Sequence, residues 1–504
     1  MARRRHGAAA PETGDPTPTP KRSKFDLGGS AERGRERISE IGDRLNRAWG
    51  KTVALPLAAA PVARVMTLPF GILMLDYRTK GGVVIGRANR MWGKKDTFKT
   101  TMCLRLVRSA QRHCRHCRYP LVISPEDGSV DCRCPTPRWW LADAEDYSWL
   151  PSPIAIQVSY GILPEAAVMK NVAGVGRAPV LKCDPPPHLK RAKAKEIVFT
   201  ETYRNEPWRT LYCDSEHTID ERWARANGID TENVELVGAD WAEKNIASIE
   251  ESVLTREFDL VIIDSTSMLE TKGDLEKTVL ENPRVAGKQS LMGRFIARYV
   301  SSTVNEGLTT RYRPTLVCTS QVSQKGIGNV KSHPYLGPTD GNRFDHGLSL
   351  DIKMFTEGYD FNEAKQQAVV GKFGFEILKS RVGASPGATG SVKFWLKETP
   401  DHPVGDSDDL VTVMDYARRL GPGFILEGSG SQKLTLVTDY VGDGSIAFPR
   451  VGDCENYLRQ NVTIYEELRR RVLDKLMEQD AELTLISSSR SDTPATSADA
   501  ATDV

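Results

Sequence analysis

Apolar residues recur along the chain in short runs that alternate with longer amphipathic stretches. Between Val65 and about Glu398, strand-like runs such as Leu260–Ile263 are separated by segments with helical spacing. Strands that alternate with helices in this way are typical of a mostly parallel sheet with helices on both faces. The pattern therefore predicts an α/β fold for the central part of the chain.

The composition of the two ends differs from that of the centre. The first residues are rich in Pro, Thr, Arg and Gly, so we expect a disordered arm that becomes helical from about Ala31. The C-terminal part predicts a small α+β unit with a Gly-rich turn and a long charged helix. The predicted units are an arm at 1–50, a core at 51–111 and 208–400, an insertion at 112–207, a C-terminal unit at 401–486 and a disordered tail at 487–504.

Charge and hydropathy exclude several classes of protein. Lys and Arg total 68 and Asp and Glu total 66, so the net charge of +2 gives no whole-chain signal for a polyanion, and a nucleic-acid surface must be a local patch. The longest apolar run, Val53 to Leu75, is broken by prolines and Arg64 and does not predict a membrane span. No apolar segment follows the N-terminal arginines, so we expect a soluble, cytoplasmic protein.

The first candidate chemistry is a phosphate-binding loop. In such loops backbone N–H groups surround the phosphates, a lysine meets their charge and a threonine hydroxyl coordinates Mg²⁺, roles that Gly93, Lys99 and Thr100 fill. Phe98 departs from the pattern, because a second glycine normally precedes the lysine, and a Lys-rich surface turn is the alternative. The candidate nucleotide contacts in the loop are Gly93, Lys94, Lys95, Asp96, Thr97, Phe98, Lys99, Thr100 and Thr101.

Two carboxylates follow apolar strands downstream of this loop. Asp264 ends the run Leu260–Ile263, which favours a role in holding Mg²⁺, although an acid at this place also serves as a helix or turn cap. Glu216 is the candidate general base, because hydrolysis needs a carboxylate that orients the attacking water; a solvated loop acid is the alternative. The loop and the two carboxylates together predict an ATPase.

Four of the nine cysteines lie close together in the insertion. In an intracellular chain this clustering favours a metal site over disulfides. Two cysteine pairs joined by a turn-rich loop predict a structural zinc site, with free or redox-active thiols as the alternative. The second pair has one intervening residue instead of two, so His113 or His116 is an alternative ligand. The predicted zinc ligands are Cys114, Cys117, Cys132 and Cys134.

Taken in order along Gly71–Met477, and apart from the insertion, these motifs resemble those of RecA-type DNA recombinases. The resemblance implies a RecA-like P-loop ATPase core that binds ATP and Mg²⁺. The segment DSEHTIDERWARANGID is similar to the family segment in which a Glu activates water, an Asp contacts adenine and an aromatic ring stacks on the base. The resemblance assigns these roles to Glu216, Asp220 and Trp223, and a Trp223 that packs in the core is the alternative.

The resemblance also implies a γ-phosphate sensor and contacts across a subunit interface. The sensor falls on Gln321, at the end of the strand that begins at Pro314. Lys379 and Arg381 share one face of a strand and resemble the family pair that reaches the ATP of a neighbouring subunit. Arg381 departs from the family lysine but keeps the charge. Two exposed basic residues on an edge strand are the alternative.

Two loops that follow the Asp264 and Gln321 strands resemble the family loops that bind single-stranded DNA. They lie within Glu270–Lys288 and Val322–Asn342, and the second is long, Gly-rich and basic. Solvated charged loops are the alternative. The candidate DNA contacts are Lys272, Lys277, Lys288, Lys325, Lys331 and Arg343.

The function that the resemblance implies is ATP-dependent recombination. We expect filaments of this protein on single-stranded DNA, which would catalyse homologous pairing and strand exchange with double-stranded DNA, and a C-terminal unit that admits the duplex. The altered phosphate loop and the insertion suggest a member of the family from a phage or a mobile element. Two alternatives stay open: a ring-shaped helicase or repair ATPase, and a recombination mediator in which Phe98 has abolished hydrolysis.

Overall fold

The computed structural model describes most of the core and parts of the flanking segments. Residues 41–48 are helical, as predicted for this part of the arm. The described residues are 41–48, 65–115, 118, 120–123, 130–132, 139–141, 163–184, 193–201, 207–238, 240–255, 257–277, 287–305, 314–325, 335–362, 364, 366–400, 402, 404–427, 433–438 and 444–491.

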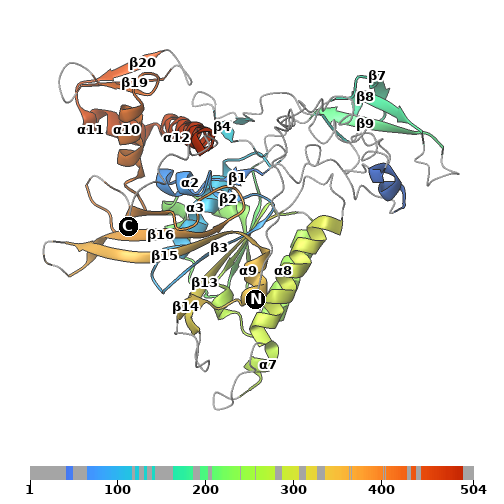
Figure 1. Ribbon diagram of the computed structural model, residues 1–504, viewed down its shortest axis with the longest axis horizontal. Helices are drawn as coiled ribbons and strands as arrows, with labels where there is room; N and C mark the ends of the chain where they lie inside the picture. Colours follow the sequence, from blue (N-terminus) through green and yellow to red (C-terminus); the bar gives the residue numbers. More distant parts are fainter. Residues whose placement is uncertain are drawn as a thin grey trace, which may run out of the picture.

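A nine-stranded sheet forms the centre of the fold (Figure 1). In spatial order its strands are β11 (Val234–Val237), β10 (Thr210–Asp214), β12 (Leu260–Asp264), β13 (Thr315–Lys325), β3 (Ala88–Gly93), β15 (Leu348–Phe361), β16 (Ala368–Ser380) and β17 (Thr389–Trp395), and β14 (Tyr335–Pro338) pairs with β13. Neighbours from β11 to β15 are parallel, whereas β16, β17 and β14 pair in an antiparallel manner. The predicted α/β fold with a mostly parallel sheet is therefore confirmed.

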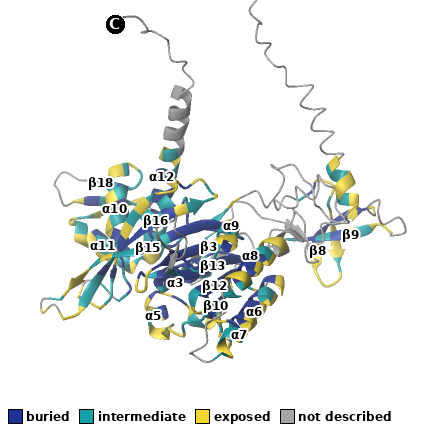
Figure 2. Cartoon of the chain, turned by 60° about the horizontal axis from the view of Figure 1, so that its bottom comes forward, coloured by how far each residue is buried: buried dark blue, intermediate teal, exposed yellow. Residues whose placement is uncertain are grey.

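Helices cover both faces of this sheet. On one face lie α3 (Lys99–Gln111) and α5 (Glu221–Ala226), and on the other lie α6 (Ala242–Thr255), α8 (Gly287–Asn305) and α9 (Asn342–Gly347). Neighbouring strand residues point to opposite faces of the sheet. Tyr212 therefore packs in the apolar cluster under α3, and Leu211 packs in the cluster under α6 and α8. The central strands are buried on both sides as a result (Figure 2). Among the described helices, none combines the length and the apolar character needed to cross a bilayer.

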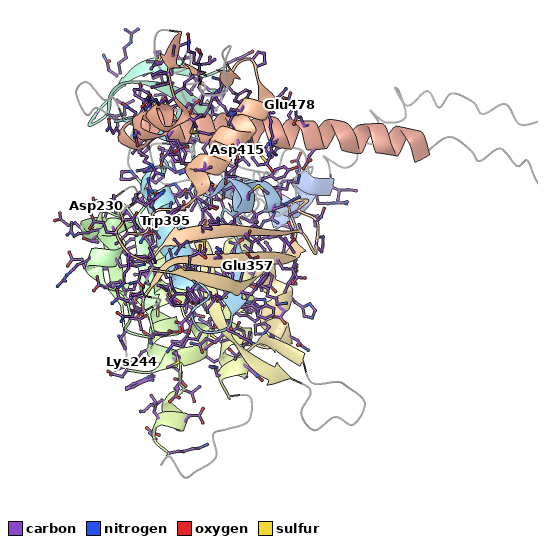
Figure 3. The ribbon with its side chains drawn as sticks, turned by 90° about the vertical axis from the view of Figure 1, so that its left-hand side faces the viewer. Asp230, Lys244, Glu357, Trp395, Asp415 and Glu478 are labelled. Atoms are coloured by element: carbon purple, nitrogen blue, oxygen red, sulfur yellow. The ribbon has the colours of Figure 1, made fainter. Side chains whose placement is uncertain are left out.

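The C-terminal part of the chain has a cluster of buried residues of its own. Its elements are α10 (Asp409–Leu420), β18 (Ile425–Glu427), β19 (Leu434–Val437), β20 (Ser445–Phe448), α11 (Val451–Gln460) and α12 (Val462–Ser491). Arg469 of α12 pairs at 2.7 Å with the buried Asp76 of α2 (Leu73–Arg78), which joins this unit to the core. Figure 3 shows the unit, marked by Asp415, at the opposite end of the molecule from Lys244. Helix α12 continues to Ser491, past the start of the predicted tail.

The insertion contains short strands and is held at the amino-terminal edge of the central sheet. Its strands are β4 (Leu121–Ile123), β5 (Val130–Cys132), β6 (Trp139–Leu141), β7 (Val168–Val172), β8 (Gly176–Cys183) and β9 (Lys195–Glu201). In front of β12, the buried Asp259 carboxylate lies 2.8 Å from Arg118 Nη1 and 3.3 Å from Arg115 Nε. The Arg118 guanidinium also lies 4.4 Å from the ring centre of Trp208, which precedes β10. The start of the insertion is therefore fixed to this edge, next to Trp208.

Before β3 the chain forms a small antiparallel pair of strands, β1 (Thr67–Leu68) and β2 (Val83–Val84), on either side of α2. Asp76 of α2 accepts hydrogen bonds from the backbone N–H groups of Phe70, Gly71 and Ile72. These bonds fix the start of α2 beside the C-terminal unit. The predicted domain boundaries as a whole remain predictions.

Candidate functional site

The loop between β3 and α3 approaches its neighbouring strand closely. A Cβ on Gly93 would lie 2.2 Å from the carbonyl oxygen of Met354 on β15, so this position requires glycine. Helix α3 begins at Lys99, and its first backbone N–H groups, which have no partner within the helix, face the loop. The sequence thus places a helix N-terminus, with its positive end, at the carboxyl edge of the sheet.

Lys99 is a buried cation with neutral partners. Its side chain is 8% exposed, and Nζ donates to the carbonyl oxygen of Lys94 at 2.7 Å and to Thr97 Oγ1 at 3.2 Å. Burial lowers the pKa of Lys99, while the charges of Asp264 and Glu216 oppose that shift. A buried ammonium without a paired anion is unfavourable, so the position is suited to an anionic ligand.

Phe98 adopts a backbone conformation that glycine takes more readily than other residues. Its φ of 63° and ψ of 18° lie in the left-handed region, which costs a non-glycine residue about 1–2 kcal/mol. The ring stacks on Phe373 of β16 with centroids 3.8 Å apart and lies 4.7 Å from Phe394 of β17. Packing of the ring against these two side chains offsets the strain of the backbone.

Asp264 ends β12 among hydroxyl groups. Its Oδ1 accepts a hydrogen bond from Thr319 Oγ1 at 2.5 Å, and its Oδ2 accepts one from Tyr212 Oη at 2.8 Å. Among the described residues Asp264 forms no salt bridge. Burial raises the pKa of Asp264, and the hydrogen bonds from Thr319, Thr100 and Tyr212 oppose this shift. The carboxylate is therefore a buried anion that a cation would stabilise.

Glu216 and Gln321 are in direct contact. Gln321 Nε2 donates to Glu216 Oε1 at 3.0 Å, and Ser265 Oγ donates to the same oxygen at 2.5 Å. The pairing of β13 with β3 sets Gln321 opposite Gly93. The candidate base, the candidate sensor and the phosphate loop therefore lie together at the carboxyl edge of the sheet.

The predicted adenine contacts have partners of their own in the structure. Asp220 is the N-cap of α5, where its carboxylate accepts a hydrogen bond from the N–H of Trp223 at 2.9 Å. Trp223 is partly buried and packs against the core under α3. These contacts match the capping and packing alternatives, and nucleotide contact by either residue stays a prediction.

The predicted interface pair holds the end of α9. Lys379 Nζ donates to the carbonyl oxygen of Asp345 at 2.6 Å, and Arg381 Nη2 donates to that of His346 at 2.7 Å. Burial and the neighbouring Arg381 lower the pKa of Lys379. Within one chain these two side chains therefore serve as clamps on a helix end, where cations are favoured. Their contact with a neighbouring subunit stays a prediction.

The first predicted DNA loop contains the short helix α7 (Lys272–Leu275). Lys272 lies over the ring of Trp241, 5.3 Å from its centre, and Lys277 lies 3.4 Å from Asp274. Lys288 belongs to the first turn of α8, and its Nζ donates to the carbonyl oxygen of Ser267 at 2.7 Å. Burial lowers the pKa of Lys288. Lys288 thus anchors α8 to the β12 edge, whereas Lys272 and Lys277 are nearer the protein surface.

The second predicted DNA loop is described only at its ends. Lys325 is the last residue of β13, Arg343 lies exposed on α9, and Lys331 lies outside the described residues. The strands β13 and β14 pair as an antiparallel hairpin from Val322 to Lys325. DNA contact by these residues stays a prediction.

The predicted zinc ligands are only partly within the described residues. Cys117, Cys134 and the alternative ligand His116 lie outside them, as does the side chain of Cys132. In the described part of the chain no three His, Cys, Asp or Glu side chains are grouped to hold a metal. His113 is buried at the end of α3, with Nδ1 2.7 Å from the carbonyl oxygen of Ser109. The zinc site remains a prediction.

Sequence reasoning did not find three polar residues that shape this site. Tyr212 and Thr319 hold Asp264, and Arg90 lies in the middle of β3 with 1% of its surface exposed. Their signal is a polar or charged residue inside an apolar strand, because such a residue needs a buried partner on a neighbouring strand.

Comparison with known proteins matches the chain to one family. Residues 197–386 match the RecA N-terminal domain, a range that includes Glu216, Asp264 and Gln321 but not the phosphate loop. Over 275 residues the chain is 26% identical to Protein RecA of Mesomycoplasma hyopneumoniae, covering 54% of this chain and 72% of that protein. It is 24% identical to Protein RecA of Staphylococcus epidermidis over 270 residues, 53% of this chain and 68% of the relative. For Streptomyces venezuelae Protein RecA the identity is also 24%, over 53% of this chain and 63% of the relative.

Proposed function

Because the chain is a divergent member of the RecA-type family, we propose that it is an ATP-dependent DNA recombinase. In this proposal the protein forms filaments on single-stranded DNA and catalyses homologous pairing and strand exchange with double-stranded DNA. The observation that carries the proposal is the 3.0 Å hydrogen bond between Gln321 and Glu216, beside Asp264. A candidate water-activating carboxylate and a candidate phosphate sensor share one contact, which suits a nucleotide-dependent switch.

The residues at this edge fit ATP and Mg²⁺. Lys99 is a buried cation with neutral hydrogen-bond partners and Asp264 is a buried carboxylate with hydroxyl partners, and within the described residues neither forms an ion pair, so both are suited to a magnesium nucleotide. When bound, ATP supplies the phosphoanhydride bond whose hydrolysis resets the switch. Thr100 and Asp264 would hold the metal ion, and Glu216 would orient the attacking water.

The proposed filament and DNA contacts involve elements next to this edge. Lys379 and Arg381 would exchange the carbonyl oxygens of α9 for the phosphates of a neighbouring subunit's nucleotide, where cations stabilise the transition state. The two loops after β12 and β13 would bind single-stranded DNA through lysines such as Lys272 and Lys277. The C-terminal unit would admit the duplex.

A structural zinc ion in the insertion is a further part of the proposal. The supporting observation is the sequence pattern of Cys114, Cys117, Cys132 and Cys134. Elemental analysis of the full chain should find about one zinc per chain, reduced in Cys117→Ser. A metal-free wild-type chain would remove zinc from the proposal and leave the recombinase function intact.

The decisive experiment measures ATP hydrolysis with and without homopolymer single-stranded DNA. The wild type should show DNA-stimulated turnover that falls by about 100-fold or more in Lys99→Ala and in Glu216→Gln. Glu216→Gln should still bind ATP, whereas Lys99→Ala should bind it weakly, so a binding assay separates the two roles. A strand-exchange assay with homologous duplex then tests recombination itself.

Other outcomes point to the other candidate functions. DNA binding without turnover in the wild type would favour the mediator, although the packing of Phe98 on Phe373 gives no structural support for an impaired loop. Turnover with unwinding of a forked duplex, and without strand exchange, would favour a helicase.

A further inference from the structure

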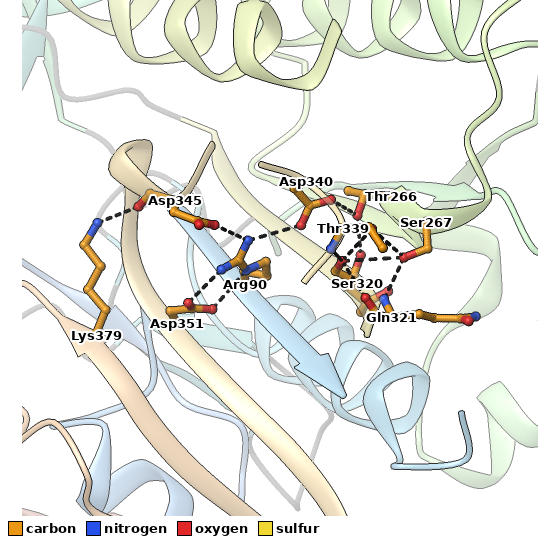
Figure 4. Close-up of polar contacts among 11 residues, drawn as sticks. Arg90, Thr266, Ser267, Ser320, Gln321, Thr339, Asp340, Asp345, Asp351 and Lys379 are labelled. Atoms are coloured by element: carbon orange, nitrogen blue, oxygen red, sulfur yellow. Dashed lines mark hydrogen bonds and ion pairs between the residues drawn. The ribbon is translucent and has the colours of Figure 1, made fainter. Parts of the chain in front are cut away.

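A single buried guanidinium connects three separate carboxylates behind the candidate site (Figure 4). Arg90, in the middle of β3, donates from Nε and Nη2 to the two carboxylate oxygens of Asp351 at 3.0 and 2.7 Å. Its Nη1 donates to Asp345 Oδ1 at 2.5 Å and to Asp340 Oδ2 at 3.2 Å. Only 1% of the Arg90 surface is exposed. This planar fork therefore joins β3, β15, α9 and the segment just before α9.

One branch of this cluster leads to the nucleotide edge. The other carboxylate oxygen of Asp340, Oδ1, lies 2.5 Å from Thr266 Oγ1, which is also 3.0 Å from the carbonyl oxygen of Thr319. Thr319 Oγ1 in turn donates to Asp264 at 2.5 Å. Two hydroxyl side chains thus connect Asp264 with Asp340 and hence with Arg90.

A parallel set of hydroxyl groups leads from Asp340 to Gln321. Ser267 Oγ accepts a hydrogen bond from the N–H of Gln321 at 2.6 Å and lies 3.1 Å from Thr339 Oγ1. Thr339 is adjacent to Asp340, and its N–H donates to Ser320 Oγ at 3.3 Å. The candidate sensor and the Arg90 cluster therefore share the segment that joins β14 to α9.

The other branch leads to the basic pair on β16. The carboxylate of Asp345 is held by Arg90, while the carbonyl oxygen of the same residue accepts the hydrogen bond from Lys379 at 2.6 Å. The next carbonyl, that of His346, accepts from Arg381 at 2.7 Å. Helix α9 is therefore hydrogen-bonded to β3 through a side-chain carboxylate and to β16 through two backbone carbonyl oxygens.

A cluster of this kind is weak evidence for stability alone. Burial of the three charged groups of Arg90, Asp340 and Asp351 is costly, and well-packed apolar residues often replace such clusters without loss of stability. The two branches instead end on groups to which the proposed function gives roles: Asp264 and Gln321 on one side, Lys379 and Arg381 on the other. A rigid connection between these groups is useful where one must respond to the other.

We propose that Arg90 is a positioning residue that couples the nucleotide edge to α9 and to the basic pair on β16. In this role it does not touch the nucleotide; it fixes Asp340 and Asp345, so that a displacement at Gln321 or Asp264 is transmitted to the carbonyl groups that hold Lys379 and Arg381. The inference rests on the proposed DNA-dependent ATPase function. It predicts that loss of the connection weakens the response of ATP turnover to DNA more than turnover itself.

The test uses the full-length protein and the ratio of ATP turnover with and without poly(dT). Thr266→Val removes the hydroxyl link and keeps the side-chain shape, and Arg90→Gln removes the fork. Both should lower the stimulation ratio by about tenfold, with the basal rate and the KM for ATP within about twofold of wild type. Thr266→Ser, which keeps the hydroxyl, should restore the ratio. The double variant should lose no more than Arg90→Gln alone, because the Thr266 hydroxyl lies on one branch of the connection that the Arg90 fork holds.

A matched control separates coupling from stability. Arg469 is also a buried arginine with a carboxylate partner, Asp76, but it lies in the C-terminal unit. Arg469→Gln should lower the unfolding temperature while leaving the stimulation ratio unchanged.

An unchanged ratio in Thr266→Val and Arg90→Gln, with stimulated wild-type turnover, would overturn the inference and leave the proposed function in place. A wild type that does not respond to DNA would overturn the proposed function itself. If Arg90→Gln does not fold, Thr266→Val and Thr266→Ser still decide the question.

Discussion

Strand β12 has a buried aspartate at each end, and their partners differ in kind. Asp259, immediately before the strand, is paired with the guanidinium groups of Arg115 and Arg118. Asp264, the last residue of the strand, has the hydroxyl groups of Thr319 and Tyr212 as partners. The amino edge of the sheet thus contains a carboxylate paired with cations that attach the insertion, whereas the carboxylate at the carboxyl edge has hydroxyl partners and no ion pair among the described residues.

The backbone conformation can also be compared between the two edges. Each edge has a non-glycine residue with a positive φ, Arg118 at 65° and Phe98 at 63°. Arg118 is held by the salt bridge to Asp259 and by the ring of Trp208, and Phe98 is held by aromatic packing. At both edges the side chain compensates for an unfavourable backbone, so strain alone does not distinguish a functional edge from a structural one. The partners of the charged groups do.

The largest expected effect comes from neutralising the carboxyl-edge aspartate. Asp264→Asn keeps the side-chain shape and removes the charge proposed to hold Mg²⁺, so DNA-stimulated ATP turnover should fall about 10³-fold, or about 4 kcal/mol. Stability should be unchanged or higher, because burial raises the pKa of Asp264 and so disfavours its charged form in the free protein. Steady-state turnover and thermal unfolding measure the two effects. Retained turnover would show that the edge does not depend on this charge.

The corresponding substitution at the amino edge should lower stability and leave ATP turnover nearly unchanged. Asp259→Asn leaves Arg115 and Arg118 without their buried counter-charge, and we expect a loss of about 3 kcal/mol in the free energy of unfolding. Turnover per folded molecule should remain within about twofold of wild type. The surface pair of Lys372 and Asp360 provides the control, since Asp360→Asn should cost under about 0.5 kcal/mol in urea titrations. Loss of turnover in folded Asp259→Asn would remove the distinction between the edges.

The carboxyl edge was more predictable from the sequence than the amino edge. Asp264 ends β12, and Gln321 is the last residue of β13 that pairs with β3, although β13 itself continues to Lys325. The carboxyl ends of parallel strands meet at one edge, so the proximity of Asp264 and Gln321 followed from the pattern. Asp259 lies between Phe258 and the apolar strand, so its neighbourhood indicates burial but not which cations pair with it. Its partners Arg115 and Arg118 lie in the insertion, more than a hundred residues away, and only tertiary packing brings them together.

The conformation of the phosphate loop was also beyond the sequence. The missing glycine suggested a loss of backbone freedom, but the compensating rings belong to Phe373 and Phe394, on strands distant in the chain. For Asp220 and Trp223 the sequence suggested a functional contact, whereas the structure shows contacts within the protein. Their sequence pattern suggested ligand contacts, and the structure gives them local roles at the start of α5.

Substitutions of Phe98 test whether ring packing offsets backbone strain at the carboxyl edge, and their expected effects are of intermediate size. Phe98→Ala removes the packing on Phe373 and keeps the left-handed strain, so unfolding should become easier by about 2 kcal/mol. Phe98→Gly removes the same packing and relieves the strain, so it should be about 1 kcal/mol more stable than the alanine variant. Chemical denaturation of the three proteins gives the order wild type, glycine, alanine. An alanine variant as stable as the glycine variant would mean that the backbone at Phe98 is not strained.

The smallest expected effect concerns His113 at the amino edge. Burial, together with the charges of Arg469, Arg118 and Arg112, lowers its pKa from 6.5 to about 4, although the contact with the Ser109 carbonyl favours the charged form. The folded protein then binds this proton less readily than the unfolded chain. The stabilising contribution is complete above pH 6.5 and is lost as the pH falls toward 4.

Between pH 7.5 and pH 5.5 this difference should lower the free energy of unfolding by about 1 kcal/mol. His113→Asn retains a donor for the Ser109 carbonyl but does not titrate, so its stability should fall less over the same interval, and the gap between the two urea midpoints should change with pH. Parallel curves for the two proteins would mean that His113 has the same pKa in the folded and the unfolded chain, so that it becomes protonated in the folded protein over this interval. At low pH the amino edge would then hold an additional positive charge beside Arg118. The partners of Asp259 and Asp264 alone would no longer explain the difference in charge between the two edges.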